Sequence, residues 1–187
     1  LWGKKNKTLM QKIKKNNVTA IIMIGGQSKR MGGGIKSFVK FNSKNTFERI
    51  LNRIKPQIEN IIVNCNEENL ELNKYNIPVI KDIKSGYLGP LAGIHTGLNW
   101  LKKNNSVTEW LVTIPGDTPF IPDNLITTFQ TKMYSKNKII LAKSRNKIHP
   151  IIGAWHISLF NSLEEEINRG VRKILDWAEL HKIDFIE

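Results

Sequence analysis

The sequence predicts an α/β fold: a single three-layer, doubly wound domain whose mostly parallel sheet is covered by helices on both faces. Strand-like and helix-like stretches alternate along the chain, and several strand-like runs are apolar at every position, as in strands buried on both faces. Glycine-rich or polar segments follow these runs, where open α/β sheets bind ligands. The 187 residues suit one domain, which we assign to residues 18–187 after a basic N-terminal extension over residues 1–17.

The first apolar run, Ala20 to Ile24, predicts an inner parallel strand. A glycine-rich basic loop follows directly, and its cations are Lys29, Arg30 and Lys36. Glycine permits close approach to the backbone, and successive exposed N–H groups form concavities that bind anions. We therefore predict a phosphate-binding loop, although a solvated basic turn would have a similar composition. The glycine spacing matches neither the P-loop nor the dinucleotide-binding pattern.

A short extended piece and a capped helix follow the loop. Residues 38–41 suggest the extended piece, and Asn45 and Thr46 are suitable N-caps for a helix that Pro56 ends or kinks. The apolar face expected for this helix consists of Phe47, Ile50, Leu51, Ile54 and Ile58.

Two polar residues come at the ends of the next predicted strands. Residues 61–63 form one apolar run, with Asn64 at its carboxyl end, and residues 77–80 form another, with Asp82 two residues beyond it. By themselves, an Asn that ends a strand and an Asp in a turn are common structural residues. Cys65, the only cysteine, is expected to be a small buried residue without a disulfide partner.

A second glycine-rich stretch, GYLGPLAGI at residues 86–94, leads into a predicted helix. Pro90 fits the first helical turn, where no N–H is needed, and Ala92 and Gly93 permit a ligand or strand to approach the helix start. A helix N-terminus also favours anions. His95 lies inside this helix, and we expect it to be structural.

The fourth predicted strand covers residues 110–114. Asp117 follows it, as part of the sequence GDTP at residues 116–119. A carboxylate at the same sheet edge as a phosphate-binding loop is well placed to hold Mg²⁺, a hard cation that prefers oxygen ligands. An alternative role is capping of the helix expected over residues 122–132, but Asp123 is better spaced for that role.

The C-terminal part predicts a strand over residues 138–142, a basic turn over 141–150, a helix over 159–167 and a closing strand over 182–187. Arg169, Arg172 and Lys173 lie between the helix and the closing strand, and they could bind a phosphate or form a solvated face. Asp184 lies in this closing strand.

The composition is that of an ordinary globular protein, 40% hydrophobic and 24% charged, but the net charge is +13. This charge raises the hypothesis of nucleic-acid binding. The cations are mostly Lys spread along the chain, without a recognised binding motif, so we expect no nucleic-acid partner. No segment has the 18 or more apolar residues of a membrane span, and we expect a cytoplasmic protein without a membrane partner.

The motifs together resemble the molybdenum cofactor guanylyltransferases, a MobA-like nucleotidyltransferase family with a Rossmann-like fold. The family's loop signature is L-A-G-G-x-S-x-R-M-G-G-x-D-K, and GPLAG, GDTP, HP and DF follow in family order. The chain departs from the signature at Met23, Ile24 and Ile35. The matching positions of the loop are Gly25, Gly26, Ser28, Arg30, Met31, Gly32, Gly33 and Lys36.

The resemblance implies transfer of GMP from GTP to the terminal phosphate of molybdenum-molybdopterin, with Mg²⁺ as cofactor and pyrophosphate as leaving group. It implies that Lys36, Arg30 and Asp117 are the catalytic residues and that Asp117 holds the metal. It also implies that His149-Pro150 shapes the acceptor side, and that other proteins deliver molybdopterin or receive the product. Asp184 matches the V-D-F position of the family, which makes it a further candidate for contact with the metal or the nucleotide. The substrate-binding residues implied are Met23, Ile24, Gly25, Gly26, Gly33, Lys36, Asn64, Asp82 and Asp117.

Two other functions stay open at this point. One is a related nucleotidyltransferase that uses CTP or another acceptor phosphate. The other is a non-catalytic basic module that binds nucleotides or nucleic acid, for which steep salt dependence would be expected.

Overall fold

The structure is a computed structural model that describes residues 17–24, 38, 40–41, 44–68, 71–84, 89–104 and 107–187. The glycine-rich loop over residues 25–36 and residues 1–16 therefore lie outside the described residues. The elements are β1 (Val18–Ile24), β2 (Lys40–Phe41), β3 (Lys44–Asn45), α2 (Thr46–Ile54), β4 (Asn60–Cys65), η2 (Leu72–Tyr75), β5 (Val79–Ile80), α3 (Pro90–Lys103), β6 (Trp110–Pro115), α4 (Leu125–Lys132), β7 (Ile139–Ser144), β8 (Lys147–His156), η3 (Ile157–Leu159), α5 (Phe160–Asn168), α6 (Ile174–Ala178) and β9 (Ile183–Ile186).

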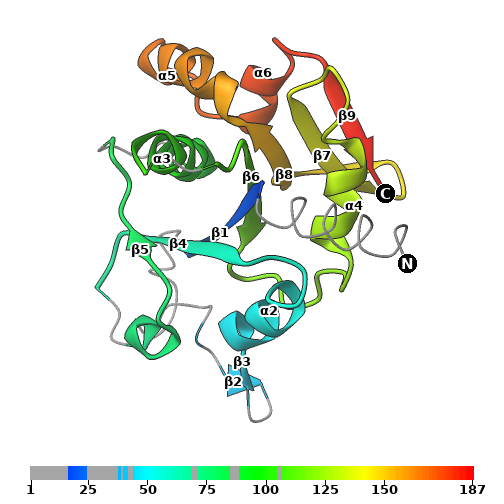
Figure 1. The fold of residues 1–187 in the computed structure, drawn as a ribbon. Coiled ribbons are helices and arrows are strands. Elements are labelled where there is room, and N and C mark those ends of the chain that lie inside the picture. The colour runs from blue at the N-terminus through cyan, green and yellow to red at the C-terminus, as the bar shows by residue number, and fades with distance from the viewer. Residues whose placement is uncertain are drawn as a thin grey trace.

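The predicted three-layer α/β architecture is confirmed. A seven-stranded sheet has the order β5-β4-β1-β6-β8-β7-β9, and only β8 runs antiparallel to its neighbours. Helices α3, α5 and α6 cover one face, and α2 and α4 cover the other (Figure 1). The carboxyl ends of all the parallel strands therefore lie at one edge of the sheet.

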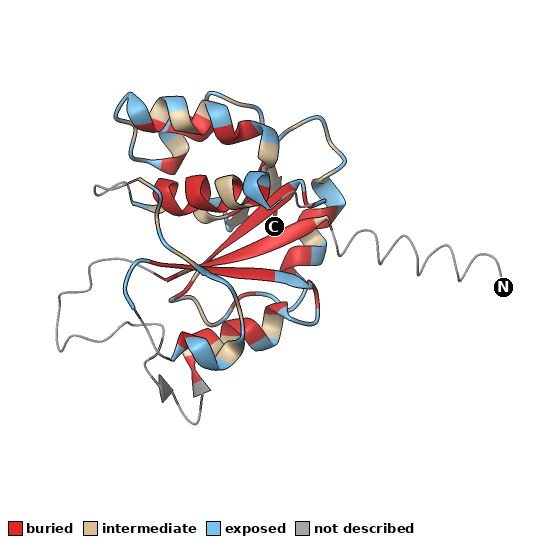
Figure 2. Cartoon of the chain, turned by 60° about the vertical axis from the view of Figure 1, so that its left-hand side comes forward, coloured by how far each residue is buried: buried red, intermediate tan, exposed pale blue. Residues whose placement is uncertain are grey.

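The central strands are buried on both faces, as their apolar sequences predict (Figure 2). Ile22 packs into the core on the α2 and α4 side, whereas its neighbour Ile21 packs into the core under α3, α5 and α6. Successive residues of a strand point to opposite faces, so a strand with a helical layer on each side must be apolar at every position.

Helix α2 begins where the sequence predicts, because Asn45 forms a capping box with Glu48. The Asn45 side chain accepts a hydrogen bond from the Glu48 backbone N–H at 2.8 Å, and the Glu48 carboxylate accepts one from the Asn45 N–H at 3.0 Å. This reciprocal pair satisfies N–H groups that the first helical turn leaves without partners.

The prediction for residues 141–150 was wrong, because most of that segment belongs to two strands and only Arg145 and Asn146 form the turn. Strand β8 has ten residues and lies between β6 and β7. Pro150 argues against an inner strand, since proline cannot donate to the ladder. The strand accommodates it in a bulge: Leu141 pairs with Gly153 and Ala142 with His149, so residues 150–152 have no counterpart on β7.

Two other predictions near the site need correction. Helix α4 begins at Leu125, three residues later than predicted, and its N-cap residue is Asn124. Asp123 does not cap it; its carboxylate pairs with the Arg53 guanidinium at 2.7 Å. Among the described residues, no helix combines the length and the apolar character needed to cross a membrane.

Candidate active site

The carboxyl end of β1 is the centre of the site. Met23 pairs with Asn64 of β4 on one side and with Pro115 of β6 on the other. The Gly116 N–H donates a hydrogen bond to the Met23 carbonyl at 2.9 Å, which fixes the start of the GDTP loop against β1. Strand β1 ends here at Ile24, the last described residue before the glycine-rich stretch of the sequence. The Ile24 side chain is 2% exposed and lies in the core, so only its main chain is available to a ligand.

Helix α3 approaches the strand ends closely at Gly93. A Cβ at this position would lie 2.6 Å from the Met23 Cε and 2.9 Å from the Asn64 Oδ1. Both distances are too short for a contact with carbon, so a side chain at residue 93 would require the Met23 and Asn64 side chains to shift, and glycine permits the close approach of α3 to β1 and β4. The expectation that Gly93 permits close packing at the helix start is confirmed.

Asn64 and Asp82, which the sequence places after different strands, are in contact. The Asn64 Nδ2 donates to the Asp82 Oδ1 at 2.9 Å and to the Ile80 carbonyl at 3.3 Å. Asn66 bonds Asp82 twice: its Nδ2 donates to the Asp82 Oδ2 at 2.7 Å, and its Oδ1 accepts the Asp82 backbone N–H at 2.7 Å. The site thus presents a carboxylate whose direction is set by two side-chain amides.

Asp117 is exposed in the loop that follows β6. Among the described residues, its recorded hydrogen-bond partner is the Thr118 hydroxyl, which donates to the Asp117 Oδ1 over a long 3.4 Å. An exposed carboxylate at a strand end suits a hard divalent cation. No group of three or more His, Cys, Asp or Glu residues that could hold a metal occurs in the described part of the chain. A cation at Asp117 would therefore need further oxygen ligands, such as phosphates and water.

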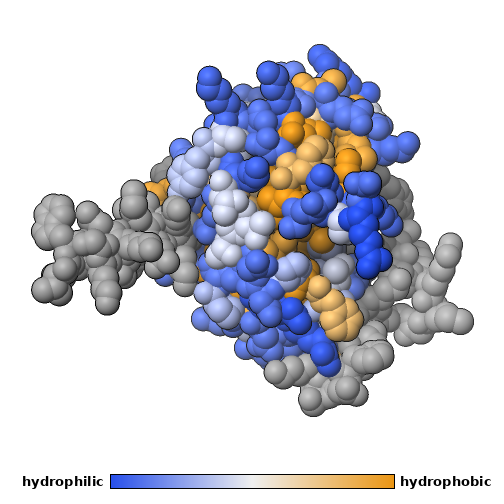
Figure 3. Space-filling view, turned by 90° about the vertical axis from the view of Figure 1, so that its right-hand side faces the viewer, coloured by the Kyte–Doolittle hydropathy of each residue, from blue (hydrophilic) through white to orange (hydrophobic). Residues whose placement is uncertain are grey.

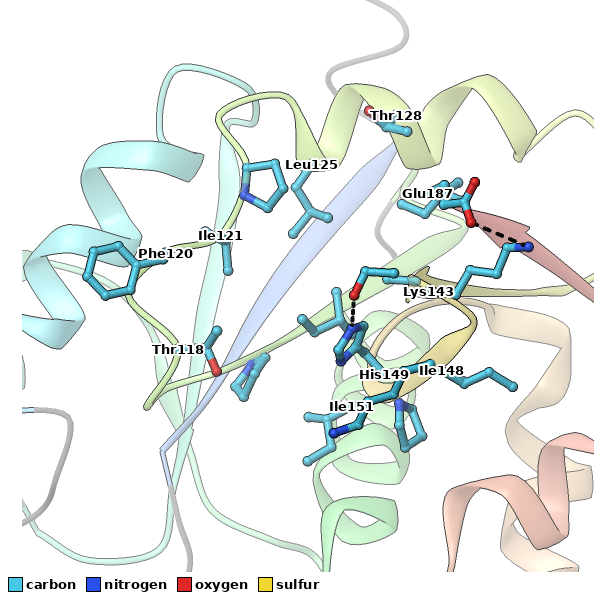
Figure 4. Close-up of a pocket in the computed structure, with 18 of the residues that line it drawn as sticks. Thr118, Phe120, Ile121, Leu125, Thr128, Lys143, Ile148, His149, Ile151 and Glu187 are labelled. Carbon is cyan, nitrogen blue, oxygen red and sulfur yellow. Dashed lines mark hydrogen bonds and ion pairs between the residues drawn. The ribbon is translucent and has the colours of Figure 1, made fainter.

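A cavity of about 550 Å³ lies beside Asp117, between the β6–α4 loop and the β7–β8 hairpin. Phe120 and Ile121 stand on one side of it, and Ile148 and His149 stand across from them (Figure 4). Figure 3 shows apolar side chains among hydrophilic ones on the side of the molecule where α4 and β9 lie. The lining of the cavity is mostly apolar, and Asp117 is one of its polar members.

The bulge in β8 forms a wall of this cavity and is held by a buried hydroxyl. The Thr113 Oγ1 lies 2.6 Å from the Ile151 carbonyl, to which it donates, and it accepts a hydrogen bond from the Trp155 Nε1–H at 3.0 Å. On the hairpin itself, the His149 Nε2 lies 2.7 Å from the Ser144 Oγ. These bonds give the irregular strand a defined shape.

Asp184 does not lie at this site. It is in the middle of β9, and its carboxylate accepts hydrogen bonds from Ser135 and Asn137, which precede β7 at the opposite edge of the sheet. The bond from Ser135 is the main cause that lowers the pKa of Asp184. Its role is to anchor the connection between α4 and β7, which corrects the expectation that it could reach the metal or nucleotide.

The three cations considered for an acceptor phosphate lie after α5. Arg169 pairs with Glu166 at 2.6 Å, and the Arg172 guanidinium donates to the carbonyls of Ile167 and Val171. The Arg172 backbone nevertheless passes near the start of α3, with its carbonyl 4.0 Å from a Cβ built on Gly89.

His95 and Cys65 are buried, as expected for structural residues. His95 is 2% exposed, stacks on Phe160 with 4.9 Å between ring centroids, and faces Glu164 at 3.4 Å. Burial lowers the pKa of His95 and raises the pKa of the Cys65 thiol. Neither side chain is placed to take part in chemistry at the sheet edge.

The predicted residues thus fall into two groups. Met23, Asn64, Asp82 and the start of the Asp117 loop are joined through the contacts above, whereas the loop residues Gly25, Gly26, Arg30, Gly33 and Lys36 lie outside the described residues. Two residues at the site were missed. Asn66 could have been found because it follows Asn64 by two positions, which places both on the same side of an extended chain. Thr113 had no such signal.

A sequence model of the MobA-like NTP transferase domain matches residues 20–183. The chain belongs to the MobA-like NTP transferase family. This MobA-like chain is therefore a nucleotidyltransferase. It is 36% identical over 162 residues to the molybdenum cofactor guanylyltransferase of Yersinia pestis, covering 85% of this chain and 78% of that protein.

Solved structures share the fold of the MobA-like chain. One is the molybdopterin-guanine dinucleotide biosynthesis protein A of Archaeoglobus fulgidus, with a TM-score of 0.72 and 22% identity over 90% of this chain and 82% of that one. Another is the 4-diphosphocytidyl-2C-methyl-D-erythritol synthase of Anaerococcus prevotii, with a TM-score of 0.68 and 16% identity over 93% and 88% of the two chains.

Proposed function

We propose that this enzyme transfers GMP from GTP to the terminal phosphate of molybdenum-molybdopterin, forming the guanine dinucleotide and releasing pyrophosphate. The observation that carries the proposal is the convergence of Met23, Asn64, Asp82 and the Asp117 loop at one sheet edge, beside a cavity of about 550 Å³. The relatives named for this reaction support the choice of substrates.

The reaction needs no nucleophilic side chain. An oxygen of the acceptor phosphate attacks the α-phosphorus of GTP in line, the new P–O bond forms, and the bond between the α-phosphorus and the bridging oxygen breaks. The leaving pyrophosphate carries the electron pair of that bond. The protein's task is to align the reactants and to stabilise negative charge in the transition state.

We assign the nucleoside to Asn64 and Asp82, and the triphosphate to the glycine-rich loop. Gly25, Gly26 and Gly33 would offer main-chain N–H groups, Arg30 and Lys36 would offer positive charge, and the main chain of Met23 and Ile24 would border the nucleotide. Support comes from the end of β1, the strand that precedes the glycine-rich loop in sequence, because it lies between Asn64 and the Asp117 loop.

A divalent cation, which we take to be Mg²⁺, fits at Asp117. The exposed carboxylate supplies one hard oxygen, and the phosphates of the nucleotide would supply others. When bound, the cation would neutralise charge on the phosphates. Asp117 would hold it at the border between the nucleotide and the acceptor.

We assign the acceptor to the cavity beside Asp117, with His149 and Pro150 in its wall. Its position next to the proposed metal ligand would bring an acceptor phosphate to the α-phosphorus. The cytoplasmic location, the proteins that deliver molybdopterin or receive the product, and the lack of nucleic-acid binding stay predictions.

The direct test incubates the enzyme with molybdenum-molybdopterin, Mg²⁺ and one nucleotide at a time, GTP, CTP or ATP. We expect pyrophosphate and the guanine dinucleotide with GTP, and little product with the others. Lys36→Ala should reduce turnover strongly, because the charge on the departing pyrophosphate would lose its cation. Equal turnover with CTP, or Lys36→Ala turnover within a few-fold of wild type, would contradict the substrate or the loop assignment.

A further inference from the structure

Asn66 makes more contacts with Asp82 than Asn64 does, although Asn66 is exposed and lies just beyond β4. Its amide nitrogen and its amide oxygen both bond to Asp82, each at 2.7 Å, and the two bonds reach different parts of that residue. The bond from the Asn66 Nδ2 fixes the Asp82 carboxylate, and the bond to the Asn66 Oδ1 fixes the Asp82 backbone N–H. Because Asn66 holds both the carboxylate and the backbone of Asp82, it restricts the χ angles of Asp82 as well as its position.

The Asp82 carboxylate keeps capacity for a ligand after these bonds. An ionised carboxylate has about four lone-pair sites. Asn64 uses one on Oδ1 and Asn66 uses one on Oδ2, so with respect to the described residues each oxygen keeps a further site. A carboxylate held in this way is suited to a ligand that offers two neighbouring donors, such as the N–H groups on a guanine edge or the two hydroxyls of a ribose.

The backbone that carries Asp82 is also anchored on its other side. The Ile83 N–H donates to the Thr96 Oγ1 of α3 at 3.2 Å, and Lys84 lies 3.9 Å from Glu164 of α5. These contacts locate the backbone but do not touch the carboxylate. Within the part of the chain that the structure describes, its direction therefore depends on Asn64 and Asn66.

We propose that Asn66 is a positioning residue that directs the Asp82 carboxylate toward paired donors of the nucleoside and so contributes to nucleotide selectivity. The proposal rests on the proposed function, in which Asp82 contacts the nucleoside of GTP. Asn66 itself need not touch the nucleotide.

The test compares Asn66→Ala and Asn66→Asp with the control Asn73→Ala, which changes an exposed Asn in η2. KM and kcat are measured with GTP, with ITP, which lacks the 2-amino group, and with 2′-deoxy-GTP. For Asn66→Ala we expect the KM for GTP to rise about 5- to 20-fold with kcat within about two-fold, because charge-assisted hydrogen bonds are lost. The control should match wild type in both constants.

Asn66→Asp separates positioning from simple loss of packing, because it keeps the size of the side chain. The new carboxylate would face the Asp82 Oδ2 and repel it unless the two share a proton. We expect a KM above that of Asn66→Ala at pH 8, and a return toward wild type as the pH is lowered to 5.5. Wild type measured in parallel corrects for other charged groups nearby, Glu67, Lys81, Lys84 and His95.

The preferences among the three nucleotides show which part of the nucleoside the Asp82 carboxylate contacts. A reduced preference for GTP over ITP in Asn66→Ala supports positioning toward the base, and a reduced preference for GTP over 2′-deoxy-GTP supports positioning toward the ribose. The proposal is overturned if Asn66→Ala keeps the GTP KM and both preferences while Asp82→Ala loses them. If Asp82→Ala is itself like wild type, the assignment of Asp82 in the proposed function fails instead.

Discussion

The two halves of the sheet edge are built in different ways. On the β5-β4-β1 side, polar groups bond one another at 2.7 to 2.9 Å, and α3 is so close that a Cβ on Gly93 would require the Met23 and Asn64 side chains to shift. On the β6-β8-β7 side, a bulged strand and a loop surround an apolar cavity, and the hydrogen bonds that shape it are buried behind its wall. The first side fixes the directions of donors and acceptors, whereas the second provides a shaped space. Substitutions on the two sides should therefore affect different substrates.

Asp117 lies at the border of the two halves, and its loss should have the largest effect. Asp117→Asn keeps the shape but removes the charge that would hold a divalent cation, so we expect kcat/KM to fall by on the order of 100-fold or more for both substrates. The measurement is pyrophosphate release across a range of Mg²⁺ concentrations. Asp123→Asn is the control from the same loop, because Asp123 pairs with Arg53 at the surface. Equal activity of the two variants would remove Asp117 from the mechanism.

Substitution of Gly93 tests the β5-β4-β1 side of the sheet edge. Gly93→Val should raise the KM for GTP at least about 10-fold and lower the free energy of unfolding by about 1–3 kcal/mol, because the new atoms overlap with Met23 and Asn64. Gly93→Ala should be milder, since the Met23 Cε is the end of a flexible side chain. Kinetics and urea unfolding measure the two effects. A Gly93→Val variant with the wild-type GTP KM would show that this contact does not shape the nucleotide side.

Substitution of Thr113 tests the β6-β8-β7 side, which surrounds the cavity, and substitution of Thr19 in β1 is the matched control. Thr113→Val leaves the buried Trp155 N–H without its acceptor, so we expect a loss of about 1–3 kcal/mol in the free energy of unfolding. The KM for molybdopterin should rise while that for GTP stays within about two-fold. The Thr19 hydroxyl is buried without a hydrogen-bond partner among the described residues, so Thr19→Val should be neutral or stabilising. A similar loss in both variants would contradict the role of the Thr113 hydroxyl.

The smallest predicted effect is a pH dependence of stability that comes from His95, a buried residue outside both sides of the sheet edge. Burial lowers the pKa of His95 below its ordinary value of 6.5, so the unfolded chain binds its proton more readily than the folded chain. This contribution to stability is complete above about pH 6.5 and is lost as the pH falls toward the folded-state pKa. His156 and His181 act in the same direction. The slope of melting temperature against pH between 7 and 5 should be smaller in His95→Leu; an unchanged slope would contradict the assignment.

The parts predicted from sequence were those governed by local pattern. Uninterrupted apolar runs identified the inner strands, and Asn45 marked the start of α2 because a capping side chain acts within a few residues. Strand β8 was missed because Pro150 is a reliable local signal against a strand. In the folded sheet, Pro150 lies in a bulge where β8 has no partner on β7, and this pairing cannot be deduced from the local sequence. The role of Asp123 was predicted wrongly and that of Asp184 stayed open, because their partners, Arg53 and Ser135, are distant in sequence.

The single thiol of the chain has a practical consequence. Cys65 stands between Asn64 and Asn66, with 2% of its surface exposed, and its Sγ donates to the Glu67 carbonyl at 3.3 Å. A maleimide can reach it only when this end of β4 separates from the core. The alkylation rate therefore reports the free energy of local opening there, without interference from other cysteines. If GTP binds at this strand end, it should slow that labelling in proportion to its occupancy.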